Sequence, residues 1–491
     1  MAPRTVLRAG ALRRASSVRR YGGGAPPAPP VRTDPTTSGE ARMTDPRTAR
    51  EAIALVTDDF TELPFSEGPS VGDGPIGWPG YSAAHDRAAA RSGESESVIC
   101  GTGVIGGVEV VLISFEFGFL GGSIGERTGA RAVAAHHLAR ARRLPVVVLP
   151  ATGGSRMHEG MRALLQLQFL ARESALTRAA GLAQIAVLRD PTTGGGWATL
   201  GAGSDVVLAL PGAQVGFAGS RVRPPDADPG AYTAEAQLAH GHIDAVVPAG
   251  ELRAALGRWL TLLTRPAEGP VPPPYALGAT SSAESGREAV SRARHPDRPR
   301  APAYLDAHFT LRAEISGDRC GGTDPGMLCG FGQGPDGRTV AYAAQCGTAT
   351  RPAGFRTAAR LVRLADRLGI PVLTLVDTPG AANDPQAERD GAGPAIAALF
   401  EAVATARVPL TSLLVGEGGS GGALALAAPG NTWATPDSYF SVIAPELATA
   451  ILKRTPEESA AIADRLRLRP EDLLDLGIVQ GVVARLPHPA S

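Results

Sequence analysis

Residues 143–154 read RLPVVVLPATGG, and residues 369–380 read GIPVLTLVDTPG. Each stretch is a short, continuous apolar run that ends in a glycine loop, as expected of a strand covered on both faces. The two stretches are 226 residues apart, and the same separation relates Gly121 to Gly347 and Gly195 to Gly421. Several landmarks in one register indicate an internal repeat of two homologous α/β modules.

The repeat extends to the elements around these strands. An amphipathic helix is expected before each strand, with apolar residues at Ala132, Ala135, Leu138 and Ala139 and at Ala358, Leu361, Leu364 and Ala365. A second helix, a second apolar strand and a second glycine loop follow in each copy. Residues 265–300 are rich in Pro, Ser, Glu and Arg with little periodicity, which is typical of a linker. We therefore expect a leader at 1–42, modules at 43–264 and 301–487, and a linker at 265–300.

Composition excludes several classes of protein. The formal net charge is zero, which argues against nucleic-acid and anionic-membrane partners. No apolar run reaches the roughly 20 residues that a membrane span needs. The four cysteines, at positions 100, 320, 329 and 346, form no C-x-x-C pair, so we expect no zinc site and reduced thiols in the cytoplasm.

The leader 1–42 is rich in Arg, Ala, Gly and Pro and has no acidic residue before Asp34. An arginine-rich, acid-poor leader is typical of a mitochondrial transit peptide. The alternatives are a disordered extension or a start site placed upstream of Met43.

Glycine loops between a strand and a helix present unpaired backbone N–H groups, which stabilise a phosphate or a developing oxyanion. Two rival patterns overlap the loop at 416–422. Residues 416–421 satisfy the dinucleotide pattern G-x-G-x-x-G, but they do not lie in the first βαβ unit of their module. Residues 418–422 satisfy G-x-S-x-G with Ser420 as nucleophile, but the only later histidine is His488, in a proline-flanked tail.

Longer strings carry a resemblance to a known family. FEFGFLGGSIG at 115–125, ATGGSRMHEG at 151–160, DPTTGG at 190–195 and GFAGSRV at 216–222 resemble the carboxyltransferase β subunit of bacterial acetyl-CoA carboxylase. DTPGA at 377–381, GEGGSGGALA at 416–425 and YFSVIAPE at 439–446 resemble its α subunit. The matches span roughly residues 45–487.

The resemblance implies two tandem crotonase-like modules of the ClpP/crotonase superfamily. The N-terminal, β-like module would hold the acyl-CoA, and the C-terminal, α-like module would receive carboxybiotin. In relatives the active site lies between the N-terminal module of one chain and the C-terminal module of another, so we expect a homo-oligomer.

The resemblance also implies roles for the residues at the positions that match the family's motifs. Gly153 and Gly154, with Gly195 and Gly196, would donate N–H groups to the thioester enolate. Gly422 and Ala423, with Gly421, would do the same for the ureido oxygen of biotin. The candidates for cofactor binding are Arg156 and Arg221 for CoA phosphates, Trp197 for the acyl pocket, and Gly380 and Gly419. Four acidic residues near the loops are expected to be caps or loop-ordering residues: Glu116, Asp190, Asp377 and Glu417.

The expected function is therefore the carboxyltransferase component of a biotin-dependent acyl-CoA carboxylase, which makes malonyl-CoA from acetyl-CoA or methylmalonyl-CoA from propionyl-CoA. Lys453 is the only lysine, and its Ile-Leu-Lys-Arg context does not fit a biotin acceptor. Carboxybiotin would therefore come from a separate biotin carboxyl carrier protein, loaded by a biotin carboxylase. Two alternatives stay open: a biotin-independent malonyl- or acyl-CoA decarboxylase or hydrolase, and a non-catalytic acyl-CoA-binding assembly subunit.

Overall fold

The first sheet is built from the N-terminal half of the chain. The computed structural model describes residues 45–65 and 72–485, so the expectations for the leader, Met43 and His488 lie outside the described residues. Seven strands pair in the order β1-β2-β3-β4-β5-β7-β9, antiparallel from β1 to β3 and parallel from β3 onward. Their bounds are Phe60–Glu62, Val98–Ile105, Val108–Phe115, Val146–Leu149, Gln184–Leu188, Val206–Ala209 and Ala245–Val246.

The second sheet repeats this arrangement in the C-terminal half. Its order is β10-β11-β12-β13-β14-β15, with β16 also paired to β14, and it changes from antiparallel to parallel after β12. The bounds are Leu311–Glu314, Met327–Gln333, Thr339–Gln345, Val372–Thr378, Leu410–Gly419, Thr432–Ala434 and Tyr439–Ser441. A two-stranded sheet, β6 (Thr192–Thr193) with β8 (Val215–Gly216), lies beside the second glycine loop of the first half.

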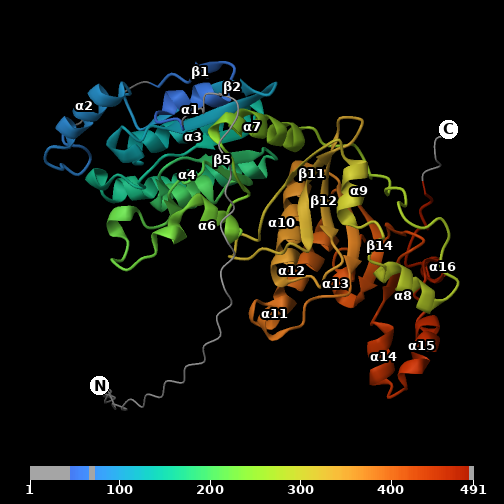
Figure 1. Cartoon of the computed structure of the whole chain (residues 1–491). Helices are drawn as coiled ribbons and strands as arrows, with labels where there is room; N and C mark the ends of the chain where they lie inside the picture. The colour runs from blue at the N-terminus through green and yellow to red at the C-terminus, as the bar shows by residue number, and fades with distance from the viewer. Residues whose placement is uncertain (1–44, 66–71, 486–491) are drawn as a thin grey trace, which may run out of the picture. The chain divides into compact units, whose positions relative to one another are not determined.

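Helices accompany both sheets (Figure 1). In the first half they are α1 Ala49–Val56, α2 Tyr81–Ser92, α3 Glu126–Arg142, α4 Met161–Ala179, α5 Gly194–Gly196, α6 Ala234–Ala239 and α7 Ala249–Thr264. Then come α8 Gly286–Arg294, α9 Ala301–His308, α10 Pro352–Leu368, α11 Pro385–Arg389, α12 Ala392–Thr405, α13 Ser420–Leu424, α14 Pro445–Ile451, α15 Ser459–Arg465 and α16 Pro470–Asp475. No helix in the described part of the chain is long and apolar enough to cross a membrane.

The predicted repeat appears as matched elements. Helices α3 and α10 begin and end 226 residues apart, and so do the starts of β4 and β13 and of β5 and β14. Both helices stop at a left-handed residue, Arg143 in one and Gly369 in the other, again at the same separation. Strand β4 is buried along its whole length, which explains its unbroken apolar run.

Part of segment 265–300 is structured. Helix α8 begins after Ser285, whose side chain accepts the N–H of Glu288 and so caps the first turn. Ala289, Val290 and Ala293 of α8 are buried in a cluster with Tyr439 and Leu468 of the C-terminal half, among others. The second half of this segment therefore packs with the C-terminal module.

Candidate active site

The first glycine loop of each module leaves the end of a central strand in the same turn. In the N-terminal module, Gly154 donates its N–H to Thr152 Oγ1 at 3.0 Å and has a φ of 101°. In the C-terminal module, Gly380 donates to Thr378 Oγ1 at 3.1 Å and has a φ of 141°. Glycine adopts such angles freely, whereas a side chain would strain them. The loop glycines are therefore required by backbone shape.

This turn already uses the N–H groups that the sequence assigned to the enolate. The N–H of Gly153 donates to the carbonyl oxygen of Gly121 at 2.9 Å, and that of Gly154 to Thr152. Neither group is free to receive a substrate oxygen in this conformation. In this conformation the two glycines shape the loop, and their role as donors stays a prediction.

The next residue in each loop offers a donor that sequence reasoning missed. Ile124 donates to the carbonyl oxygen of Gly154 and accepts from the N–H of Arg156, so the N–H of Ser155 between them points to the opposite side. Ala381 lies in the same way between two hydrogen bonds to Thr350. Successive residues of an extended segment direct their N–H groups to opposite sides, which leaves these two donors available. Ser155 and Ala381 are themselves 226 residues apart, so the repeat in the sequence could have indicated this pair of donors.

The second glycine loops bring further donors close to the first. Gly195 and Gly196 lie in the first turn of α5, where N–H groups have no partner within the helix. A Cβ atom on Gly154 would lie 3.5 Å from the backbone nitrogen of Gly195. In the other module a Cβ on Gly422 would overlap the backbone nitrogen of Ala381. Two loops thus converge in each module, which is the arrangement an oxyanion hole needs.

The remaining predicted site residues, Ala423, Gly419, Gly421 and Trp197, differ in how closely neighbouring atoms surround them. Ala423 is the fourth residue of α13, the first position whose N–H can find a partner within the helix, and its donor role stays a prediction. A Cβ on Gly419 would overlap the Pro379 carbonyl, whereas one on Gly421 would meet nothing within 4 Å. Trp197 packs against Gly201, where its ring occupies the space a Cβ would need.

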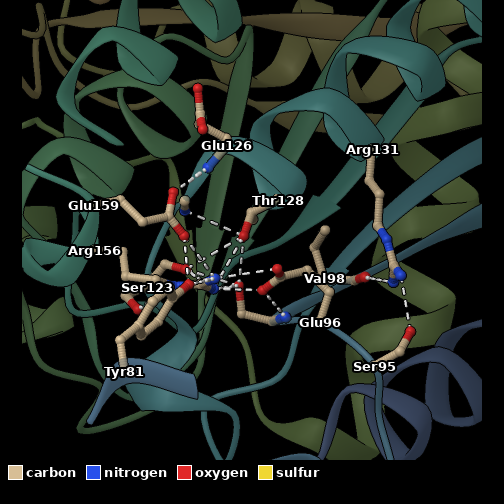
Figure 2. Close-up of polar contacts among 12 residues, drawn as sticks. Tyr81, Ser95, Glu96, Val98, Ser123, Glu126, Thr128, Arg131, Arg156 and Glu159 are labelled. Atoms are coloured by element: carbon tan, nitrogen blue, oxygen red, sulfur yellow. Dashed lines mark hydrogen bonds and ion pairs between the residues drawn. The ribbon is translucent and has the colours of Figure 1, made fainter. Parts of the chain in front are cut away.

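Arg156 lies in a buried polar network directly after Ser155 (Figure 2). Its side chain is 1% exposed. Its partners are Glu96, Glu159 at 3.2 Å, the Tyr81 hydroxyl at 3.1 Å, the Ser123 carbonyl at 2.8 Å, Ser97 Oγ at 3.1 Å and Thr128 Oγ1 at 3.2 Å. The network therefore ties the first glycine loop to α2, to α3 and to the segment that precedes β2.

The electrostatics of this network follow from burial. Desolvation acts to raise the pKa of Glu96, but the charge and hydrogen bonds of Arg156 outweigh it and the pKa is lowered. Burial raises the pKa of Tyr81 to about 12, so its hydroxyl stays protonated. Because Arg156 is enclosed by these groups, its placement argues against the predicted contact with CoA phosphates. Arg221 is exposed in the 3₁₀ turn Ser220–Val222 and stays a candidate.

The four carboxylates near the loops make contacts that suit the expected loop-ordering role. Glu116 accepts the N–H groups of Ala49 at 2.7 Å and Gly118 at 2.8 Å. Asp190 accepts the N–H of Gln214 at 2.9 Å. Asp377 and Glu417 are paired with arginines.

Thiol chemistry is disfavoured as well. Burial raises the pKa of Cys100 to about 12 and that of Cys346 to about 11, so both thiols are protonated at neutral pH. The site therefore consists of backbone donors held by buried ion pairs.

Comparison with known proteins identifies the family to which this chain is similar. A family model described as carboxyl transferase domain matches residues 80–258, and one described as acetyl co-enzyme A carboxylase carboxyltransferase-like matches residues 282–490. A relative from Saccharopolyspora erythraea, acetyl-coenzyme A carboxylase carboxyl transferase subunits beta/alpha, is 39% identical over 420 residues, covering 82% of this chain and 74% of the relative. A probable biotin-dependent acyl-coenzyme A carboxylase beta3 subunit from Mycobacterium tuberculosis is 36% identical, covering 83% and 84%.

Solved structures show the same fold. The transcarboxylase 12S structure with hydrolysed methylmalonyl-coenzyme A superimposes with a TM-score of 0.72 at 21% identity, covering 90% of this chain and 91% of that one. A single-chain, multi-domain long-chain acyl-CoA carboxylase gives a TM-score of 0.69 at 20% identity, covering 89% of this chain and 46% of that one. These likenesses confirm two crotonase-like modules, and the sequence matches confirm the resemblance drawn from the motifs. The chain belongs to the acetyl-CoA carboxylase carboxyltransferase family, as an enzyme that joins a β-like and an α-like half in one polypeptide.

Proposed function

We propose that this carboxyltransferase holds an acyl-CoA in its N-terminal module and carboxybiotin in its C-terminal module, and that it carboxylates acetyl-CoA or propionyl-CoA. The observation that carries the proposal is the repeated donor pair. Ser155 with Gly195 or Gly196 forms one pair, and Ala381 with Gly422 forms the other. One hole would serve the thioester oxygen and the other the ureido oxygen.

The reaction suits such a pair of holes. Carboxybiotin, when bound, would supply the carboxyl group as carbon dioxide by cleavage of its N–C bond, and its ureido nitrogen would take up the α-proton of the thioester as the new C–C bond forms. Both transient charges lie on carbonyl oxygens, so backbone donors can stabilise them without a side-chain base.

Biotin and its carrier would come from other proteins. Lys453, the single lysine, follows Leu452, which caps the end of helix α14, and is exposed with a φ of 55°. Its flanking residues do not form the acceptor sequence of a biotin carrier. We therefore expect a biotin carboxyl carrier protein and a biotin carboxylase as partners. The cysteines are free in the described structure, which favours a reducing compartment such as the cytoplasm.

A homo-oligomer is supported by an exposed apolar face on and next to helix α4. Large apolar side chains repeat at helical spacing along it and are between 42% and 65% exposed: Met157, Met161, Leu164, Leu165, Phe169 and Leu176. A soluble monomer rarely leaves such a continuous face uncovered. A second copy of the chain would cover it, and the solved transcarboxylase 12S relative is described as a hexamer.

The decisive experiment runs the reaction backwards. The protein is incubated with malonyl-CoA, with and without biocytin, and acetyl-CoA formation is followed. We expect turnover only with biocytin, because the carboxyl group must be transferred to the ureido nitrogen. Equal turnover without biocytin would identify a decarboxylase instead. Thioester hydrolysis with release of free CoA would identify a hydrolase.

A further inference from the structure

The predicted linker sends three arginines into the glycine loops of the C-terminal module. We call Arg294, Arg298 and Arg300 the arginine strap. Arg298 is the innermost: its side chain is 4% exposed, and Nη2 lies 2.5 Å from Asp377 Oδ1. Its Nη1 also donates to the carbonyl oxygen of Val415 at 3.2 Å, just ahead of the second glycine loop.

Asp377 connects the strap to both glycine loops. Its Oδ1 also accepts the N–H of Glu417 in the second loop at 3.2 Å. Its carbonyl oxygen accepts the N–H of Gly347 at 2.8 Å. The chain then continues directly into the Thr378–Gly380 turn, which precedes the Ala381 donor. A shift of this carboxylate would therefore move both halves of the donor pair.

Glycines make room for the strap. A Cβ on Gly416 would overlap both Asp377 Oδ1 and Arg298 Nη2, and a Cβ on Gly347 would overlap Arg300 Nη1. Neither glycine has to be explained by a ligand, because the guanidinium groups already occupy the space. The absence of a side chain at Gly347 and Gly416 thus leaves the space that Arg300 and Arg298 occupy.

Arg294 holds the outer side of the second loop. Its Nε lies 2.8 Å from Glu417 Oε2, and its Nη1 lies 2.8 Å from Glu446 Oε1. The Tyr439 hydroxyl donates to the same Glu417 oxygen at 2.7 Å. Glu417 is thereby fixed by its backbone through Asp377 and by its side chain through Arg294.

We infer that the arginine strap is a set of positioning residues for the biotin half of the site, acting through Asp377 and Glu417 on the N–H groups of Ala381 and Gly422. This inference rests on the proposed function for the identity of the ligand. Within the described part of this chain, the polar contacts of the strap go to its own segment and to the C-terminal module, and none goes to the first glycine loops at 151–155 and 194–196. Its loss should therefore weaken the use of biotin and leave the use of the acyl-CoA intact.

The test compares Arg294→Met and Arg298→Met with Arg292→Met in the full-length protein. Arg292 is a matched control, because it lies on the same helix and pairs with Glu288 at 2.6 Å without touching a glycine loop. Biocytin-dependent formation of acetyl-CoA from malonyl-CoA gives kcat/KM for each substrate. Removing one partner of a charged hydrogen bond should lower kcat/KM for biocytin by about tenfold or more. The KM for malonyl-CoA should match that of the control.

Hydrogen exchange provides a readout that does not depend on activity. Peptides covering 416–424 should exchange faster in both strap variants, while peptides covering 151–160 should not change. Because Arg298 is buried and its variant can misfold, Arg294→Met carries the test on its own. An unchanged kcat/KM for biocytin, or an equal loss for both substrates, would overturn the inference. If the wild type turns over without biocytin, the proposed function fails first, and faster exchange in 416–424 then shows only a structural role.

Discussion

The Arg156→Met substitution tests the network that holds the first glycine loop. It removes the guanidinium but leaves Glu96 and Glu159 buried, with side chains 0% and 5% exposed. Removing one partner of a buried ion pair costs about 3–5 kcal/mol, since the remaining charge has lost its compensation. At about 2–4 °C per kcal/mol for a module of this size, the melting temperature should fall by about 6–20 °C.

Arg162→Met is the matched control. Arg162 pairs with Glu126 at 3.2 Å, but its side chain is 61% exposed, and such a pair contributes about 0–1 kcal/mol. Both variants are measured by thermal unfolding followed by tryptophan fluorescence. A fall for Arg156→Met no larger than that of the control would refute the reasoning.

The pH dependence gives an independent check on the same network. The folded pKa of Glu96 is lowered in the wild type, so its contribution to stability is present above the unfolded pKa of about 4.3 and is lost as the pH falls through the folded pKa. Without Arg156, burial raises the pKa of Glu96 and is opposed only by the Ser97 N–H and the charge of His85. Glu96 of the variant therefore takes up a proton at a higher pH than Glu96 of the wild type. The loss of stability of the variant relative to the wild type should be largest near pH 7 and smaller at pH 5. A deficit that is constant over this range would show that Glu96 does not carry the effect.

Two further pairs of variants probe the loops. Gly422→Ala places a Cβ onto the backbone nitrogen of Ala381, whereas a Cβ in Gly421→Ala meets nothing within 4 Å. We expect Gly422→Ala to lower biocytin-dependent turnover about 100-fold, on the scale of one lost oxyanion donor. Gly421→Ala should change the turnover little. Equal turnover in the two would exclude the convergence of loops in the C-terminal module. Ser155 Oγ is buried without a hydrogen-bond partner in the described part of the chain, so Ser155→Ala should leave the melting temperature unchanged or raise it, by at most about 1 kcal/mol in stability. Thr152→Val removes the acceptor of the Gly154 N–H and should lower the melting temperature, so the opposite order of these two variants would contradict the proposed turn.

Local patterns in the sequence determined the repeat and the fold class. An apolar run such as Val146–Leu149 has to be buried on both faces, and a loop such as Ala151–Gly154 has to follow where the strand ends. These requirements act over a few residues, so they are visible without a structure. The same holds for the loop glycines, because a positive φ depends on the residue's own backbone.

Only the tertiary structure decided which groups of the loops are free and what holds them. The N–H of Gly153 donates to the carbonyl oxygen of Gly121, on the far side of helix α3 in the sequence. Asp377 pairs with Arg298 in the predicted linker, 79 residues away. A glycine in a motif therefore indicates where a donor loop lies, whereas the free N–H that we propose as the donor belongs to its neighbour Ser155. Arg156 shows the same limit, since a guanidinium read from sequence alone serves a phosphate as well as a buried carboxylate. Hydrogen bonds and ion pairs between distant segments depend on the distances that folding creates, and no local pattern encodes those distances.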